Sequence, residues 1–152
     1  PNVAMYPVAL TDRTKAPLNG TRRYVVHFSP GQAKPPVKFF WSLTLYDNDS
    51  FFVDNPIDRY LVNDRSDLTY NDDGSLDIYV QPEAPTNPDQ LTNWLPSPAA
   101  SSVQPAFRMT MRLYGLSKQG IQGLYAGTGW QLPTILPCGE GNATSTGIAC
   151  AN

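Results

Sequence analysis

The sequence is built around Phe39-Phe40-Trp41-Ser42-Leu43-Thr44-Leu45-Tyr46-Asp47, a stretch rich in aromatic residues and free of Ala, Glu and Lys. This composition is typical of a β-strand that packs against neighbouring strands. Side chains alternate between the two faces of a strand, so positions 39, 41, 43 and 45 share an apolar face. The opposite face carries Phe40 and the hydroxyl groups of Ser42, Thr44 and Tyr46. We expect a central strand with one face in the core and the other lining something polar.

Other segments show the same kind of pattern. Residues 107–114 alternate between apolar and polar side chains, and so do residues 76–80, which follow the turn signal Asn71-Asp72-Asp73-Gly74. Shorter strands are expected at 24–28, 51–53, 59–62 and 130–133, and residues 81–104 are expected to form a long proline-rich loop. The 15 prolines and 11 glycines argue against long helices. The pattern predicts an all-β fold, a jelly-roll-like two-sheet β-sandwich with long loops and little helix, and an open barrel is the alternative.

The length of 152 residues suits a single domain. We expect the β-sandwich domain to span residues 1–137, followed by a tail at 138–152 that Cys138 and Cys150 close into a loop. Residues 1–10 are apolar but interrupted by Pro7, which cannot donate to a strand ladder. They therefore predict either an edge strand of this domain or a strand exchanged with another copy.

The totals also exclude several classes of function. A formal net charge of −2 argues against nucleic acid as a partner, and the absence of a long apolar run argues against a transmembrane segment. The sequence has one histidine, His27, and its two cysteines are spaced for a disulfide rather than for a tetrahedral metal site. We therefore expect no metal and no cofactor, and no motif marks a catalytic residue.

Three Asn-x-Ser/Thr triplets begin at Asn19, Asn48 and Asn142, and all lie in turn-rich polar segments. A glycan on any of them would project into solvent. A disulfide between Cys138 and Cys150 would require an oxidising compartment. Together these features predict a secreted glycoprotein located outside the cell or at its surface.

A candidate ligand surface follows if residues 107–114 neighbour the central strand. Arg108, Arg112 and Tyr114 would then share a face with Thr44 and Tyr46, and guanidinium groups beside hydroxyls and rings suit a carboxylate or a sugar. The competing interpretation is a plain solvent-facing sheet surface strengthened by contacts between arginine and aromatic rings.

Trp94 lies beside Leu95 and Pro96 in the long loop. A buried indole there would fix the loop to the body of the domain. An exposed indole would offer a stacking surface for a sugar, so Trp94 joins the candidate ligand residues.

Several motifs occur in a fixed order: Phe40-Trp41-Ser42-Leu43-Thr44-Leu45-Tyr46-Asp47, Arg59-Tyr60, Asp73-Gly74-Ser75-Leu76, Asn93-Trp94-Leu95-Pro96, Met111-Arg112-Leu113-Tyr114, and Trp130 with Pro133. In these motifs the chain resembles domain-of-unknown-function family 1214, from about residue 18 to residue 133. Such domains often form the carboxy-terminal half of proteins whose first half is domain-of-unknown-function family 1254. The resemblance implies a jelly-roll-like β-sandwich and brings no established activity.

We therefore expect a secreted, glycosylated module with a structural or binding role, such as a subunit of an extracellular assembly or filament. Its partners would be further copies of itself or a larger surface scaffold. The alternative is an enzyme or small-ligand binder that uses the Arg/Tyr-lined sheet face for an anionic or sugar-like ligand. A third possibility is a sugar-binding module that uses exposed tryptophans.

Overall fold

The structure is a computed structural model, and it describes residues 3–152 apart from the side chain of Glu140. The strands are β1 (Val3–Met5), β2 (Val8–Ala9), β3 (Tyr24–Phe28), β4 (Val37–Asp47), β5 (Leu61–Asn63), β6 (Leu76–Gln81), β7 (Trp94–Pro96), β8 (Phe107–Leu116) and β9 (Thr134–Pro137). The helices are α1 (Pro88–Thr92), α2 (Lys118–Ala126) and a short 3-10 turn, Glu140–Asn142. These strands form two sheets, so the expected all-β sandwich is confirmed.

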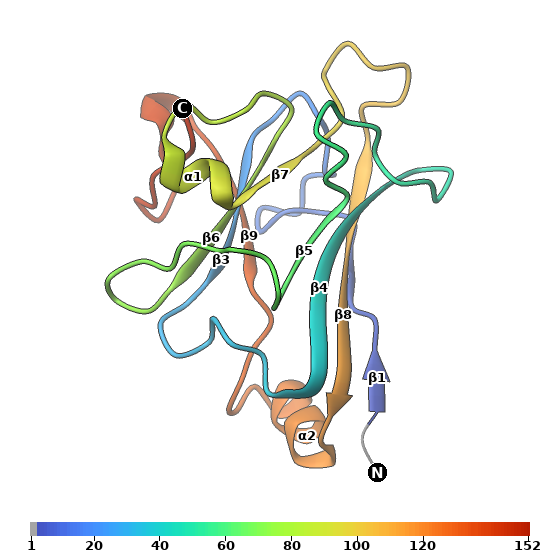
Figure 1. Ribbon diagram of the computed structural model, residues 1–152, viewed down its shortest axis with the longest axis vertical. Coiled ribbons are helices and arrows are strands. Elements are labelled where there is room, and N and C mark those ends of the chain that lie inside the picture. The colour runs from blue at the N-terminus through green and yellow to red at the C-terminus, as the bar shows by residue number, and fades with distance from the viewer. Residues whose placement is uncertain (1–2) are drawn as a thin grey trace.

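The first sheet has the order β1-β8-β4-β5, with β2 also paired to β8, and the second has the order β7-β6-β3-β9. Figure 1 shows β4 and β8 as the long strands on the right, with β3, β6 and β9 crossing on the left. The core lies between the sheets. Strand β4 contributes Trp41, Leu43 and Leu45 to it, all at most 3% exposed.

The central strand pairs with β8 along almost its whole length. Leu43 is opposite Met111 and Leu45 is opposite Met109, and all four side chains are buried. This pairing confirms that residues 107–114 neighbour the central strand.

The start of β4 departs from the simple alternation. Phe39 was expected on the core face, but its side chain is 60% exposed, so that expectation was wrong. The pairing of β4 with β8 shifts register between Val37 and Phe40, which is the signature of a β-bulge. A bulge adds one residue to one strand and thereby turns Phe39 out of the core. Opposite it, Gly115 adopts a φ of +88°.

Strand β6 is buried on both faces. Leu76, Ile78 and Val80 point into the main core, as the alternation predicts, and each is 0% exposed. Tyr79 points the other way and packs with Val25 against Cys150 and Ala151 of the tail. The tail therefore buries Tyr79 on the outer face of β6. Asp77, on the same face, is buried among His27 and Asn71 instead.

The tail is held in place by covalent and polar contacts. Cys138 and Cys150 form a disulfide with their Cα atoms 6.1 Å apart. The guanidinium of Arg23 donates to the carbonyl of Ala151 at 2.7 Å, and the backbone N–H of Thr86 donates to the carbonyl of Asn152 at 2.9 Å. The expected disulfide is therefore present in the structure.

Some elements differ from the sequence-based expectation. The long loop 81–104 contains α1 and the short strand β7, which pairs in parallel with β6. The glycine-rich segment after β8 forms α2, capped by the Ser117 side chain, which accepts from the N–H of Gly120, and ended by Gly127 at a φ of +70°. The last strand is β9 rather than residues 130–133.

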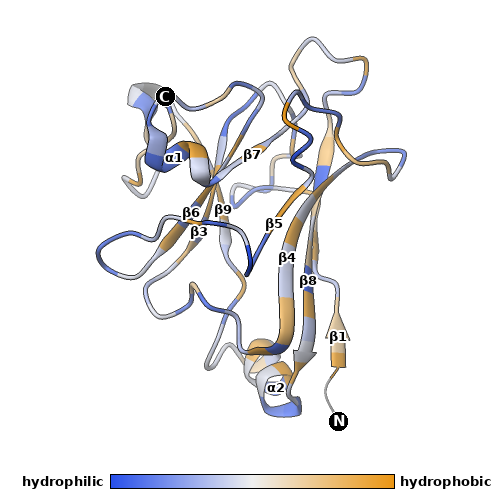
Figure 2. Ribbon diagram, in the orientation of Figure 1, coloured by the Kyte–Doolittle hydropathy of each residue, from blue (hydrophilic) through white to orange (hydrophobic). Residues whose placement is uncertain are grey.

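The amino-terminal segment lies along β8 at the edge of the first sheet. Ala4 is opposite Tyr114 and Val8 is opposite Thr110. The hydrophobic colouring of β1 stands out at this edge in Figure 2. From Val3 onward, the amino-terminal segment is therefore an edge strand of its own domain, as one of the two expectations for residues 1–10 had it. Pro1 and Asn2 lie outside the described residues.

No helix between residues 3 and 152 has the length and apolar character that crossing a membrane requires.

Candidate functional site

The outer face of the first sheet collects arginine and aromatic side chains from β4, β8 and the loops beside them. We call this surface the arginine–aromatic face. It consists of Tyr6, Phe40, Thr44, Tyr46, Phe52, Tyr60, Arg108, Arg112 and Tyr114. The pairing of β4 with β8 places Phe40 opposite Tyr114, and Tyr46 opposite Arg108. Sequence reasoning thus correctly placed Thr44, Tyr46, Arg108, Arg112 and Tyr114 on one surface.

Arg112 is the centre of this face. Its Nη1 donates to the hydroxyl of Thr44 at 2.9 Å, and its Nη2 donates to the hydroxyl of Tyr46. The guanidinium also lies 5.5 Å from the centre of the Tyr46 ring, within the range of a cation–π interaction. Thr44 is 0% exposed, so its hydroxyl is closed beneath Arg112 and other neighbours and is not open to a ligand.

Arg108 lies directly opposite Tyr46 on β8 and contacts the same ring. Its guanidinium lies 5.6 Å from the centre of the Tyr46 ring, and its Nη2 donates to the hydroxyl of Ser50 at 2.9 Å. Phe52 stacks on Tyr46 at 5.4 Å and on Tyr60 at 5.2 Å. Two cations and three rings therefore converge at this end of the face.

A second aromatic group lies at the other end of β4 and β8. Phe40 stacks on Tyr114 with ring centres 4.4 Å apart, and Tyr6 meets Tyr114 edge-on at 5.6 Å. The hydroxyl of Tyr6 donates to that of Tyr114 at 2.7 Å, and this hydrogen bond raises the pKa of Tyr6 above its ordinary value. Arg112 thus lies between two groups of rings.

Neither arginine of the arginine–aromatic face takes part in an ion pair among the described residues, although the hydroxyl of Tyr60 donates to the carboxylate of Asp58 at 2.9 Å. In the part of the chain that the structure describes, two ion pairs occur, Arg22 with Asp12 and His27 with Asp77. Neither Arg108 nor Arg112 has a carboxylate oxygen within 4.0 Å. Two guanidinium groups with hydroxyl and ring partners but no acid partner leave room for an anion.

Trp94 does not belong to this face. It lies in β7 of the second sheet, is 2% exposed, and donates its indole N–H to the carbonyl of Gln81 at 2.8 Å. Of the two expectations for Trp94, the buried indole is therefore the one observed, and this indole fixes its loop to β6. Trp41 is 3% exposed in the core, and Trp130 is partly buried and donates to the carbonyl of Gln32 at 2.8 Å.

A family model, described as a protein of unknown function (DUF1214), matches residues 3–118 and so covers both strands of the arginine–aromatic face. The chain belongs to the DUF1214 family. No protein with a curated description matches this DUF1214 chain.

Among solved structures, the DUF1214 chain is similar to the VPA0106 protein from Vibrio parahaemolyticus. The TM-score is 0.69 with 29% sequence identity, over 90% of this chain and 31% of that chain. The DUF1214 chain therefore spans about a third of the length of VPA0106.

The three sequons of the DUF1214 chain differ in their surroundings. Asn48 is exposed in the turn after β4, and Asn19 is half-buried, with its side-chain oxygen accepting from the N–H of Thr21. The side-chain amide of Asn142 is already hydrogen-bonded, because its Nδ2 donates to the carbonyl of Cys150 at 3.1 Å and to the side chain of Asn152. Since Nδ2 is the atom that would carry a glycan, Asn48 has the most suitable geometry and Asn142 the least.

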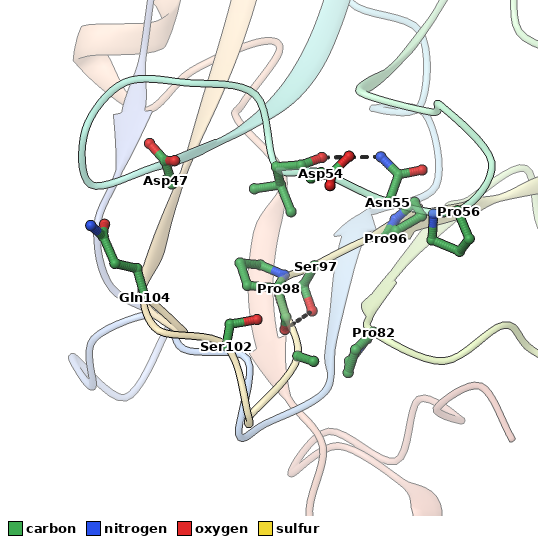
Figure 3. Close-up of a pocket in the computed structure, with 12 residues that line it drawn as sticks. Asp47, Asp54, Asn55, Pro56, Pro82, Pro96, Ser97, Pro98, Ser102 and Gln104 are labelled. Atoms are coloured by element: carbon green, nitrogen blue, oxygen red, sulfur yellow. Dashed lines mark hydrogen bonds between the residues drawn. The ribbon is translucent and has the colours of Figure 1, made fainter.

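A cavity of about 270 Å³ opens between the loop after β4 and the loop after β7 (Figure 3). Its lining combines the carboxylates of Asp47 and Asp54 with four prolines, and includes no histidine, cysteine, lysine or arginine. The carboxylate of Asp47 accepts the backbone N–H groups of Asp49 and Phe51, both at 2.9 Å, so it stabilises the turn. Two serines, Ser97 and Ser102, also line the cavity, and the hydroxyl of Ser97 donates to the carbonyl of Pro98 at 3.3 Å.

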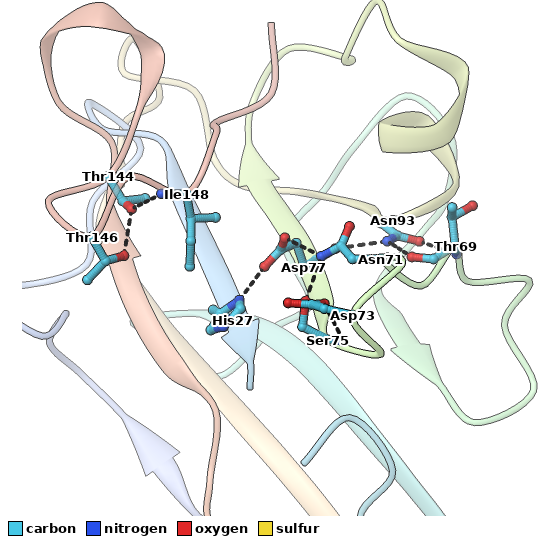
Figure 4. A network of polar contacts seen from close by, with 10 residues as sticks. All are labelled: His27, Thr69, Asn71, Asp73, Ser75, Asp77, Asn93, Thr144, Thr146 and Ile148. Carbon is cyan, nitrogen blue, oxygen red and sulfur yellow. Dashed lines mark hydrogen bonds and ion pairs between the residues drawn. The ribbon is translucent and has the colours of Figure 1, made fainter. Parts of the chain in front are cut away.

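His27 belongs to a polar network on the second sheet (Figure 4). Its Nδ1 lies 2.6 Å from Asp77 Oδ1, and Asn71 donates to Asp77 Oδ2 at 2.8 Å. His27 and Asp77 are opposite each other on β3 and β6, so they form a cross-strand pair. Across residues 3–152, no hydroxyl or thiol hydrogen-bonds to His27, and no group of three or more His, Cys, Asp or Glu side chains could hold a metal ion.

Sequence reasoning missed the contribution of three loop and edge residues, Tyr6, Phe52 and Tyr60, to the arginine–aromatic face. Their positions depend on which loop folds over the sheet, and alternation along one strand carries no information about that. The exposed Phe51-Phe52 pair beside a turn was the available signal, because paired aromatic residues in a polar loop need a surface to stack on.

Proposed function

We propose that this DUF1214 chain is a secreted, glycosylated binding module whose contact surface is the arginine–aromatic face. The ligand is an anionic, sugar-like molecule, such as a chain of sugars that carry carboxylate groups. One observation carries this proposal: Arg108 and Arg112 converge on the Tyr46 ring without a carboxylate partner, between two groups of aromatic rings. A binding role is favoured over catalysis because the described residues gather no nucleophile, base and orienting group in one place.

The chemistry of the face fits such a ligand. A guanidinium binds a carboxylate through two parallel hydrogen bonds, and Arg112 keeps donors beyond the two that contact Thr44 and Tyr46. The exposed ring of Phe52, which is 51% exposed, offers a flat apolar surface beside these charges. Binding would be weakened by salt, because the charges involved are close to solvent.

The test is binding of an acidic oligosaccharide, oligogalacturonate, to the chain and to the double variant Arg108→Gln/Arg112→Gln. We expect a loss of affinity of at least about tenfold, since each charged contact contributes on the order of 1 kcal/mol or more. The double variant Arg13→Gln/Lys15→Gln is the matched control, because it removes the same charge from an exposed loop. Equal losses in both variants would show that only net charge matters and would contradict a site at this face.

Secretion and glycosylation are tested on native material. The disulfide supports an oxidising compartment, and the exposure of Asn48 supports a glycan there. Peptide mapping is expected to find Asn48 occupied and Asn142 empty. Native protein with no glycan at any sequon would overturn the extracellular assignment.

Self-association is a second candidate function, favoured by the amino-terminal segment. Val3, Tyr6, Val8 and Leu10 are 40–63% exposed although they are large and apolar. The segment pairs with β8 at an edge, where a neighbouring copy could supply the same strand in the same register. Repetition of such an exchange gives a filament unless its rotation closes a ring.

Sedimentation of the full chain and of a variant lacking residues 1–10 tests this second function. Assembly of the full chain and its loss in the variant would support strand exchange. A full chain that stays monomeric at high concentration would contradict it, and that result would leave ligand binding at the arginine–aromatic face unaffected.

A further inference from the structure

A separate apolar opening lies at the seam between the two sheets, beneath β2. A cavity of about 90 Å³ lies there, and none of the residues that line it has a polar or charged side chain. Its walls come from both sheets, with Leu43, Met109 and Met111 on one side and Val26 and Ile135 on the other. A cavity of this composition does not hold water well and is suited to an apolar guest.

The cavity adjoins a larger hollow at the surface. This outer hollow, of about 590 Å³, lies between the amino-terminal segment and α2 and shares Pro7 and Leu132 with the cavity as lining residues. Tyr125, on its rim, is 80% exposed, and Gln131 is the one polar amide in its lining. Among residues 3–152, no charged side chain lines either hollow.

All three methionines of the chain line these two hollows. Met5 lies at the outer one, while Met109 and Met111 line the cavity. Methionine is flexible and polarisable, so it adapts its shape to apolar guests and is favoured at surfaces that accept them. With every methionine placed at this one seam, the walls of the two hollows can adapt to the shape of an apolar guest.

We propose that this seam binds a single unbranched hydrocarbon chain, with its end in the cavity between the sheets and the rest along the outer hollow. A narrow chain fits a small inner cavity that shares Pro7 and Leu132 with a surface hollow, whereas a protein surface is too broad to enter it. The uncharged lining means that a neutral headgroup is bound at least as well as an anionic one. This site is independent of the arginine–aromatic face.

The test uses 1-octanol and octanoate as probes at millimolar concentrations. We expect 1-octanol to bind with one-to-one stoichiometry, to raise the Tm, and to give nuclear Overhauser contacts to the methyl groups of Met109 and Met111. Octanoate is expected to bind no more tightly than 1-octanol. Tighter binding of octanoate, or contacts to other methyl groups alone, would overturn the proposed site.

Two variants localise the binding. Leu132→Asp puts a charge at the shared mouth of the hollows without touching the packed core, because Leu132 is 38% exposed. It is expected to weaken 1-octanol binding at least about tenfold, since a carboxylate must then be desolvated beside the chain. The control Leu91→Asp, at a residue 42% exposed on α1, is expected to bind as the unchanged chain does.

The variant Ala9→Leu fills the cavity from the edge strand β2 and is expected to abolish binding even though the chain stays folded. Equal affinity of Leu132→Asp and the unchanged chain would overturn the proposal, and so would a failure of the unchanged chain to bind 1-octanol. A dimer that 1-octanol dissociates would show that a second copy occupies the seam, which would also overturn it.

Discussion

Arg112 donates a hydrogen bond to the hydroxyl of Thr44 at 2.9 Å, and Thr44 is fully buried although it lies on the outer face of its sheet. The outer face of the central strand pair is therefore partly closed by its own side chains. A long arginine folded over a threonine covers apolar surface with its methylene groups while its charged end stays near water. The same arrangement fixes the position of the guanidinium on this face.

Replacement of Thr44 by Val tests this relationship. Valine has nearly the same shape but no hydroxyl, so Arg112 loses one acceptor, and we expect a loss of about 0.5–1.5 kcal/mol in the free energy of unfolding by urea. The matched control is Thr110→Val on the neighbouring strand, where the structure gives the buried hydroxyl no hydrogen bond. An equal loss at both positions would assign the effect to threonine burial rather than to Arg112.

Gly115 faces the bulge at the start of β4, and we expect Gly115→Ala to destabilise the chain by roughly 2 kcal/mol or more. Its φ of +88° disfavours a side chain, and a Cβ there would lie 2.8 Å from the Cβ of Lys38 and 2.7 Å from the ring of Phe39. Gly147→Ala is the control, because Gly147 has a φ of +81° but open space around it. Thermal unfolding of both variants separates backbone strain from the clash, and equal losses would contradict the clash.

The disulfide is expected to stabilise the tail and the second sheet together. Replacement of both Cys138 and Cys150 by Ser should lower the free energy of unfolding by roughly 3 kcal/mol, as is usual for loops of this length. Hydrogen exchange should become faster around Val25 and Tyr79, which pack against the tail. Unchanged exchange there would mean that the polar contacts of Arg23 and Thr86 hold the tail without the disulfide.

Asp73 makes a testable contribution to stability at low pH. Hydrogen bonds from the hydroxyl and backbone N–H of Ser75, at 2.6 and 2.9 Å, hold the pKa of the Asp73 carboxyl below 3.8. A depressed folded pKa means that the carboxylate stabilises the fold above the pKa of the unfolded chain. This contribution is lost as the pH falls through the folded value. Carbon NMR titration should show the low pKa, and Ser75→Ala should raise it toward 3.8; no change in that variant would contradict the assigned cause.

Much of the fold follows from local pattern. The alternation along residues 41–45, 76–80 and 107–114 identifies the side chains that face the main core, because each of these strands packs one face against it. It does not predict that Thr44 and Tyr79, on the opposite faces, are buried as well. Five members of the arginine–aromatic face also follow once the two long strands are assumed to be neighbours: Thr44, Tyr46, Arg108, Arg112 and Tyr114. That assumption was needed, since the two strands come from opposite halves of the chain.

The remaining features depend on contacts between distant segments. Phe39 leaves the core because a bulge forms opposite Gly115. Tyr79 is buried because the tail returns over β6. Helix α2 forms in a glycine-rich segment because Ser117 and Gly127 cap its two ends. These capping residues were present in the sequence, but the glycine content of the segment argued against a helix.

The pairing of β4 with β8 also has a consequence for how fast the chain folds. The two longest strands of the first sheet are separated by a long stretch of chain, which must close into a loop before they can pair. Closing this loop costs conformational entropy before any of their contacts form. The expected result is slow folding, in the range typical of all-β proteins with distant strand pairs. The amino-terminal segment pairs with β8 across a still longer stretch of chain, as Val8 opposite Thr110 shows, so the edge of β8 that it covers is expected to stay open longest.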